Sequence, residues 1–244
     1  DARHSMEPDE AMTGTLYGGG LGPGDPELLT LKAHRLISSA SVIAYPTLAG
    51  SDSFARAIAA DVIPHTAREI VMDVPMTTAR APAQAAYDTG AAQIAAELEK
   101  GSNVIALCEG DPFFYGSFMY LFARLSDQFR TEIVPGVTSM TACAAAQGLP
   151  LAARNEVLTV IPGPLDEATM AARISEADSL IIMKVGRHLP KIRRVLEAAG
   201  LGDRAAYIER ATLPNEVRLP LTKAPGKAPY FSMILVTKGA DPWL

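Results

Sequence analysis

The chain has 244 residues, of which 48% are hydrophobic, enough to bury a large core as one long domain or two short ones. Its formal net charge of −5 argues against broad nucleic-acid binding, which needs a strong positive field. No apolar stretch approaches the roughly 20 residues that cross a bilayer, and residues 1–11 hold no apolar signal core, so we expect a cytoplasmic protein without a membrane segment.

Short apolar runs in the first half alternate with alanine-rich segments, as in parallel strands that helices cover on both faces. The pattern predicts an α/β fold. Strands are predicted at Thr15–Tyr17, Ser41–Tyr45, Glu69–Met72, Asn103–Leu107 and Glu132–Pro135, and helices at Pro26–Ser39 and Ala83–Glu99.

After residue 150 the chain starts a second series of strands, which predicts two domains, 12–148 and 149–244. The strands are predicted at Val157–Ile161, Ser179–Met183, Ala205–Ile208 and Met233–Thr237, with a helix at Leu189–Ala199. The segment Leu213–Pro229 contains proline and lysine and is interpreted as a loop or hairpin. We therefore expect a mixed sheet in the second domain.

The cysteines and histidines show no metal-binding pattern. Cys108 and Cys143 are each embedded in apolar sequence, which favours buried thiols over a disulfide or metal pair. The four histidines have no ligand spacing. We predict no protein-bound metal.

Two glycine-rich turns carry the main functional signal. Gly18–Pro26 follows one strand, and Cys108–Gly116 follows another, each containing Gly-Asp-Pro. Asp25 is predicted to cap the next helix, with Pro26 at its first position. Neither the dinucleotide nor the P-loop template fits the first turn. Because open α/β sheets bind ligands at the carboxyl ends of parallel strands, the two turns together predict a site, better suited to a zwitterionic nucleoside than to a polyphosphate.

Three segments carry a family resemblance: Gly20–Ala33, Glu109–Pro112 and Val134–Ser139. Together they resemble the tetrapyrrole methylases, and the similarity runs from about Thr15 to Val236. This resemblance implies two α/β domains, S-adenosylmethionine held in the cleft between them, S-adenosylhomocysteine as product, and a homodimer. Tyr17, Gly110–Ser117, Met183–Arg187 and Tyr207–Arg210 resemble the branch that methylates carbon-20 of precorrin-2 to give precorrin-3A in cobalamin biosynthesis.

The resemblance also implies which residues bind the cofactor, largely through their backbone. These are Pro23, Glu109, Gly110, Asp111, Phe114, Thr138, Ser139, Val185, Ala211 and Ser232. The chain departs from the commoner family pattern at Glu109, Val185 and Ala211.

A multi-anionic tetrapyrrole needs cationic side chains to orient it. Lys184, Arg187 and Arg210 are candidates, and the alternative for each is a solvated surface charge. Asp111, Tyr17, Glu156 and Lys184 are assigned to the reacting centre, where the carboxylates would face pyrrole N–H groups or a cationic intermediate. For Glu156 the alternative is an exposed position before a strand, and for Tyr17 a place in the core.

We predict no dedicated general base. Other readings remain open at this point: a different branch of the family, acting on cobalt-factor II, another precorrin, uroporphyrinogen, RNA or a protein, and a non-catalytic nucleotide-binding module.

Overall fold

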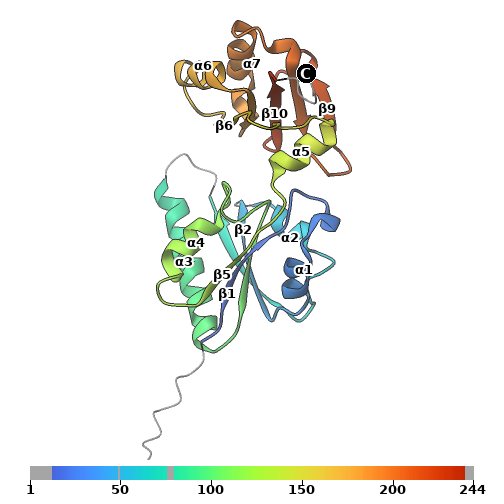
Figure 1. Ribbon diagram of the computed structural model, residues 1–244. Coiled ribbons are helices and arrows are strands. Elements are labelled where there is room, and N and C mark those ends of the chain that lie inside the picture. The colour runs from blue at the N-terminus through green and yellow to red at the C-terminus, as the bar shows by residue number, and fades with distance from the viewer. Residues whose placement is uncertain (1–12, 49, 76–79, 240–244) are drawn as a thin grey trace, which may run out of the picture. The chain divides into compact units, whose positions relative to one another are not determined.

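The structure of the chain is a computed structural model that describes residues 13–48, 50–75 and 80–239. It contains two compact units, each an α/β layer structure (Figure 1). The first unit comprises residues up to Gly22 together with Pro26–Val137, and the second comprises Pro23–Asp25 and Thr138–Leu244. This division falls before residue 138, whereas the sequence placed the boundary after residue 148.

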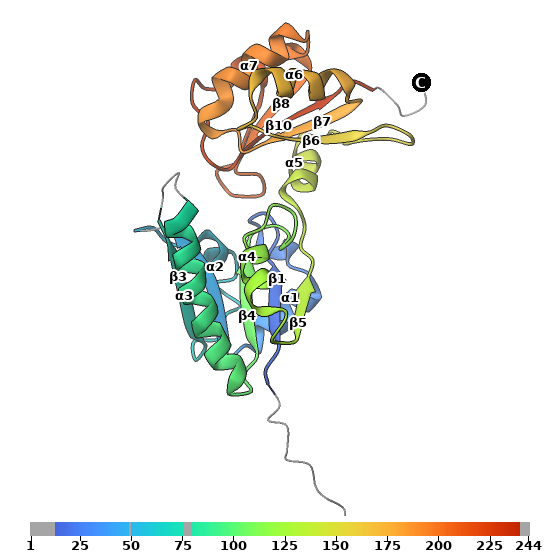
Figure 2. The same ribbon diagram turned by 90° about the vertical axis from the view of Figure 1, so that its left-hand side faces the viewer.

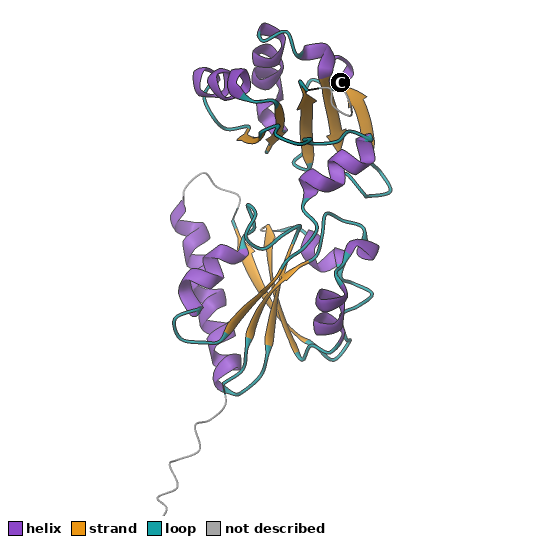
Figure 3. Cartoon of the chain, in the orientation of Figure 1, coloured by secondary structure: helices purple, strands orange, loops and turns teal. Residues whose placement is uncertain are grey.

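The first unit is built on a five-stranded sheet with the order β3-β2-β4-β1-β5. Its strands are β1 (Leu16–Gly20), β2 (Val42–Leu48), β3 (Arg68–Val74), β4 (Val104–Cys108) and β5 (Thr131–Val134). Every described pairing in this sheet is parallel, which confirms the predicted sheet type (Figure 3).

Helices cover both faces of this sheet, as Figure 1 shows. Helices α1 (Leu31–Ser38) and α2 (Phe54–Ile58) pack on one face, and α3 (Arg80–Glu99) and α4 (Phe118–Leu125) on the other. The central strand β4 is buried throughout because its side chains alternate between the two cores. Val104 and Ala106 belong to the α3/α4 core, and Ile105 and Leu107 to the α1/α2 core.

The helix predicted at Pro26–Ser39 is divided into two elements. A short 3-10 helix, η1, spans Pro26–Leu28, and α1 begins only at Leu31. The Thr30 hydroxyl accepts a hydrogen bond of 3.1 Å from the Ala33 N–H and so caps α1. Asp25 directly precedes Pro26, the first residue of η1, whereas the side chain that caps α1 is that of Thr30.

The second unit has a five-stranded sheet with the order β6-β7-β10-β8-β9, and this sheet is mixed, as predicted. Its strands are β6 (Leu158–Pro162), β7 (Ser179–Met183), β8 (Ala205–Glu209), β9 (Val217–Pro220) and β10 (Ser232–Thr237). Strands β6 and β7 are parallel, while β10 is antiparallel to both neighbours. Strand β9 pairs antiparallel with β8, which gives the segment Leu213–Pro229 a hairpin strand followed by the 3-10 turn η4 (Leu221–Lys223).

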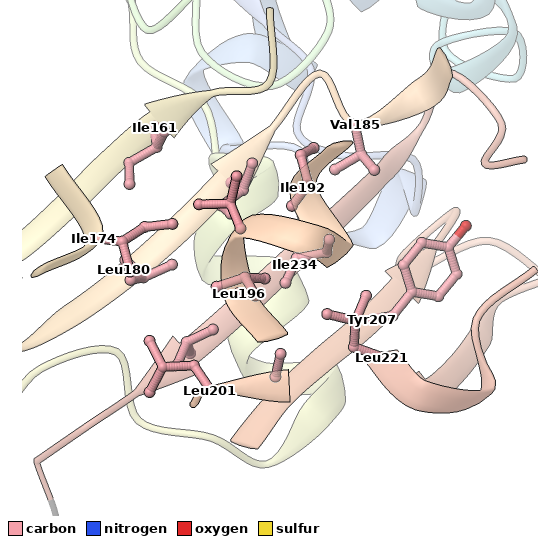
Figure 4. Packing of buried hydrophobic residues seen from close by; sticks show 14 of the residues in the cluster. Ile161, Ile174, Leu180, Val185, Ile192, Leu196, Leu201, Tyr207, Leu221 and Ile234 are labelled. Atoms are coloured by element: carbon pink, nitrogen blue, oxygen red, sulfur yellow. The ribbon is translucent and has the colours of Figure 1, made fainter. Parts of the chain in front are cut away.

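Helices α6 (Glu167–Glu176) and α7 (Leu189–Ala198) cover one face of the second sheet, and α5 (Ser139–Gln147) the other (Figure 2). Between the sheet and α6/α7 lies a core of aliphatic side chains (Figure 4). Helix α5 belongs to this unit because the Gln147 side-chain amide donates to the Tyr207 carbonyl at 3.0 Å, and the Arg218 guanidinium donates to the Ala146 carbonyl.

None of the helices in the described ranges is both long and apolar enough to cross a membrane.

Candidate functional site

Three backbone segments meet at the carboxyl edge of the first sheet, where β1, β4 and β5 end side by side. A Cβ atom added to Gly136 would lie 2.1 Å from the Gly110 carbonyl oxygen, and one added to Gly20 would lie 2.5 Å from the Gly136 nitrogen. Real Cβ atoms do not approach that closely. The close approach of these three backbones therefore requires glycine at Gly20 and Gly136.

Direct hydrogen bonds join the two Gly-Asp-Pro turns. The Gly110 N–H donates to the Gly22 carbonyl at 2.7 Å, and the Gly22 N–H donates to the Gly110 carbonyl at 3.2 Å. Both residues have positive φ angles, 77° for Gly22 and 63° for Gly110, which glycine adopts without strain. The structure thus brings together the two turns that the sequence marked separately.

The first glycines of the opening run lie in a strand rather than in a turn. Gly18, Gly19 and Gly20 belong to β1. A Cβ on Gly18 would lie 2.5 Å from the Phe118 ring, so this glycine makes room for a buried aromatic side chain of α4. The prediction that the run Gly18–Pro26 is a loop from its first residue was therefore wrong.

Asp111 holds the turn after β4 and links it to β5. Its Oδ1 accepts from the Phe113 and Phe114 N–H groups at 2.9 and 3.1 Å, and its Oδ2 accepts from the Gly136 N–H at 3.1 Å. Both oxygens of the carboxylate are engaged with backbone. We therefore infer that Asp111 acts through the loops that it positions.

Glu109 is a part-buried carboxylate at the end of β4. Burial raises its pKa, and hydrogen bonds from backbone at Glu109 and Ala55 partly offset that effect. No salt bridge joins Glu109 to a lysine or arginine among the described residues. It is thus an acid held at the loop edge without a cationic side chain to balance it.

Aromatic side chains surround the turn that Asp111 organises. Phe113 and Tyr115 are exposed, whereas Phe114 is part-buried and meets the Tyr115 ring edge-on at a centroid distance of 5.1 Å. Tyr115 also has a positive φ of 56°, an uncommon conformation for a residue with a side chain. The turn therefore offers both aromatic faces and strained backbone.

Tyr17 lies away from these loops. It is the second residue of β1, three positions before the strand ends, which corresponds to about 10 Å along an extended chain. Its part-buried ring packs against the core beneath α1 and α2. The structure does not bring Tyr17 together with Asp111.

In the second unit, most of the predicted residues gather at one edge of the sheet. Strands β7 and β8 both run antiparallel to β10, so they end where β10 begins. Ser232 opens β10 and pairs with Glu209, the last residue of β8. Lys184 follows the last residue of β7, and Arg210 follows Glu209. The residues placed at this edge are Lys184, Val185, Arg187, Arg210, Ala211 and Ser232.

Backbone strain is concentrated at the same edge. Lys184, Arg210 and Thr212 have positive φ angles of 56°, 49° and 70°. Such conformations cost about 1–3 kcal/mol each in residues with side chains and cluster at functional sites. The strain is therefore a second indication that this edge binds a ligand.

Arg210 is held by an internal network. Its guanidinium donates to the Glu209 carboxylate at 2.6 Å and to the Asn215 carbonyl at 3.1 Å, while the Tyr207 hydroxyl donates to the same buried carboxylate at 2.7 Å. Burial and the neighbouring Glu209 carboxylate raise the pKa of Tyr207. Glu209 offsets the charge of Arg210, and Lys184 and Arg187 add positive charge at exposed positions of the same edge.

The segment Pro23–Asp25 belongs to the same end of the second unit. The Asp25 N–H donates to the Thr212 hydroxyl at 3.1 Å, and a Cβ on Gly24 would lie 2.7 Å from the Leu213 side chain. Thr138 is the N-cap residue of α5, and Ser139 is its first residue.

Glu156 lies at the opposite edge of the second sheet. It precedes β6, its carboxylate accepts from the Ala153 N–H at 2.8 Å, and it sits against Gly239, just beyond the end of β10. The structure does not bring Glu156 together with Lys184.

Gly136 lies within the segment Val134–Ser139 that resembles the family, but it was not predicted as a site residue. The sequence signal for Gly136 was present: it is a third glycine directly after a predicted strand, as in the other two loops.

The described residues contain no group of three or more histidine, cysteine, aspartate and glutamate side chains that could hold a metal ion.

A comparison with known protein families identifies one that covers most of the chain. The model of the tetrapyrrole (corrin/porphyrin) methylases matches residues 15–224. The chain belongs to this family. It is 43% identical over 237 residues to a precorrin-2 C(20)-methyltransferase of Sinorhizobium sp, covering 93% of this chain and 97% of that protein.

Two further members of the tetrapyrrole methylase family bear on the function. A cobalt-precorrin-2 C(20)-methyltransferase of Salmonella typhimurium is 35% identical over 231 residues, covering 93% of this chain and 98% of that protein. The solved structure of a uroporphyrin-III C-methyltransferase from Thermus thermophilus, complexed with S-adenosyl homocysteine, is 26% identical, with a TM-score of 0.65 and 92% of each chain covered.

Proposed function

We propose that the chain is an S-adenosylmethionine-dependent methyltransferase that methylates carbon-20 of precorrin-2 in cobalamin biosynthesis. The observation that carries this proposal is the similarity over nearly the whole length of both chains to a protein that bears this activity in its name. The product would be precorrin-3A.

Backbone at the ends of strands fits the cofactor. The glycine contact at Gly20, Gly110 and Gly136 leaves no space for side chains between those loops, so main-chain groups form the edge of the first sheet. The proposed cofactor-binding residues are Pro23, Glu109, Gly110, Asp111, Phe114, Thr138, Ser139, Val185, Ala211 and Ser232.

S-adenosylmethionine supplies an electrophilic methyl group, so the protein mainly has to orient the two reactants and exclude water. In this proposal Lys184 and Arg187 bind carboxylates of the tetrapyrrole. Arg210 fixes the end of β8 through Glu209, and Asp111 fixes the loop after β4. Tyr17 and Glu156 stand outside the reacting centre because they lie away from both loop edges. The homodimer remains a prediction from the family resemblance, and the cytoplasmic location remains a prediction from the sequence.

The test is anaerobic incubation of the chain with S-adenosylmethionine and precorrin-2. We expect one added methyl group by mass spectrometry, located at carbon-20 by NMR. A methyl group on another carbon would assign the chain to another branch, and turnover confined to RNA or protein would refute the tetrapyrrole substrate. Binding of ATP or NAD in preference to S-adenosylmethionine would favour a non-catalytic nucleotide-binding module.

The cobalt-containing substrate is the second candidate, because the Salmonella relative is named for it. Parallel assays with precorrin-2 and cobalt-precorrin-2 compare the two directly. We expect the higher kcat/KM for the metal-free substrate, since the Sinorhizobium relative is the more similar of the two.

A further inference from the structure

Two adjacent aromatic side chains in the second unit are exposed to solvent. Tyr230 is 74% exposed and Phe231 is 40% exposed, and their rings meet edge-on with centroids 5.0 Å apart. Single exposed apolar residues are normal on protein surfaces, but adjacent large apolar side chains that form one exposed patch often mark a binding surface. The location of this pair therefore matters.

The pair lies at the edge of the second sheet where β7 and β8 end and β10 begins. Phe231 directly precedes Ser232, and its carbonyl accepts from the Arg210 N–H at 2.8 Å. Strand β10 pairs with β7 on its other side, and extending that register places Lys184 beside Ser232. Both aromatic residues thus sit between the ends of β7 and β8, where the chain carries its strained backbone.

Burial separates two layers at this edge. Val185, Ala211 and Ser232, which are proposed to contact the cofactor, are 0%, 8% and 7% exposed. Lys184 and Arg187 are exposed, as are the two aromatic rings. The inner layer suits a ligand held by backbone, and the outer layer combines apolar ring surface with positive charge.

We propose that Tyr230 and Phe231 bind the tetrapyrrole, packing against its macrocycle while Lys184 and Arg187 take its carboxylates. This inference rests on the proposed function. A large apolar ring system with anionic substituents complements aromatic surface flanked by cations.

The test compares Phe231→Ala and Tyr230→Ala with Val157→Ala. Val157 is an exposed apolar residue of the same unit, but it precedes β6 and so lies at the opposite edge of the sheet. Precorrin-2 binding is titrated anaerobically through the absorbance of the ring system, and S-adenosylhomocysteine binding is measured by calorimetry. We expect each aromatic variant to weaken precorrin-2 binding by about tenfold, with S-adenosylhomocysteine binding and the control unchanged.

Equal precorrin-2 affinity in wild type and both aromatic variants would overturn the inference, as would an equal loss of S-adenosylhomocysteine affinity. Tyr230→Ala removes a mostly exposed ring, so this variant keeps the test valid if Phe231→Ala disturbs folding. If the wild type binds S-adenosylhomocysteine but no tetrapyrrole, the proposed function itself fails.

Discussion

Single side chains at the loop edges differ in how their charge is balanced. Glu209 is buried and is matched by Arg210 and the Tyr207 hydroxyl, whereas Glu109 is part-buried and has only backbone donors. The first arrangement stabilises a strand end. The second keeps a carboxylate in surroundings that favour its neutral form.

Glu109 should therefore make the stability of the chain pH-dependent. Its folded-state pKa is raised above the ordinary value of 4.5. Ionisation of Glu109 therefore lowers the free energy of unfolding as the pH rises from about 4.5 through the folded-state pKa. Glu109→Gln removes the ionisable group. The free energy of unfolding of this variant, measured by urea denaturation, should increase relative to wild type as the pH rises above about 4.5.

The same substitution at Glu99, an exposed residue of α3, removes an equal charge and serves as the control. If the two glutamine variants follow the same pH dependence, burial of Glu109 is not the cause.

At the scale of elements, the sequence predicted best those strands whose side chains are all buried. The apolar runs at Val104–Cys108 and Ser179–Met183 were located within a residue because both faces of their sheets are covered. Helices α5 and α6 were not predicted, since their short alanine-containing sequences lack a clear apolar stripe. Strand β9 has only four residues and alternates in burial, so it was interpreted as loop or hairpin.

Only part of the candidate site, like only part of the fold, could be predicted from the sequence. The Gly-Asp-Pro turns could be found from residues alone, because glycine and aspartate have specific backbone roles. The edge of the second sheet came only from the family resemblance. Tyr230 and Phe231 escaped notice because nothing local in a sequence tells an exposed aromatic residue from a buried one.

The meeting of three loops at glycine predicts a specific sensitivity. In Gly136→Ala the new methyl group would overlap the Gly110 carbonyl, and the backbone would have to move. We expect a loss of about 1–3 kcal/mol in the free energy of unfolding and weaker binding of S-adenosylhomocysteine. Gly226 has nothing within 4 Å of an added Cβ, so Gly226→Ala should change stability by less than about 0.5 kcal/mol. Similar losses in both variants would contradict the close contact.

For the whole molecule, each unit has cores of its own, two in the first and one in the second. Each unit also contains one buried cysteine: Cys108 at the end of β4, and Cys143 in α5. Burial raises the pKa of Cys143 to about 12 and also raises that of Cys108. Because thiolates are the reactive form, both residues should be inert in the folded chain at about pH 8.

These two thiols can report separately on the units. Cys108→Ala leaves only the cysteine of the second unit, and Cys143→Ala leaves only that of the first. With an aromatic disulfide reagent and increasing urea, we expect the two variants to become reactive at different urea concentrations, because the two units have separate cores. A common midpoint for both variants would mean that the units unfold as one.

The order of strands in the second sheet also bears on how the chain is made. Strand β10 is the last in sequence, yet it lies between β7 and β8. During synthesis, β7 and β8 must leave the ribosome and wait with unpaired inner edges until residues 232–237 emerge. The first unit passes a similar stage earlier, because β4 fills the gap between β1 and β2 by residue 108, and β5 completes the sheet by residue 134. Before β10 emerges, a nascent chain would therefore hold a complete first sheet and a second sheet with unpaired strand edges. At that stage the chain is most prone to aggregate, and binding by a chaperone would protect it most.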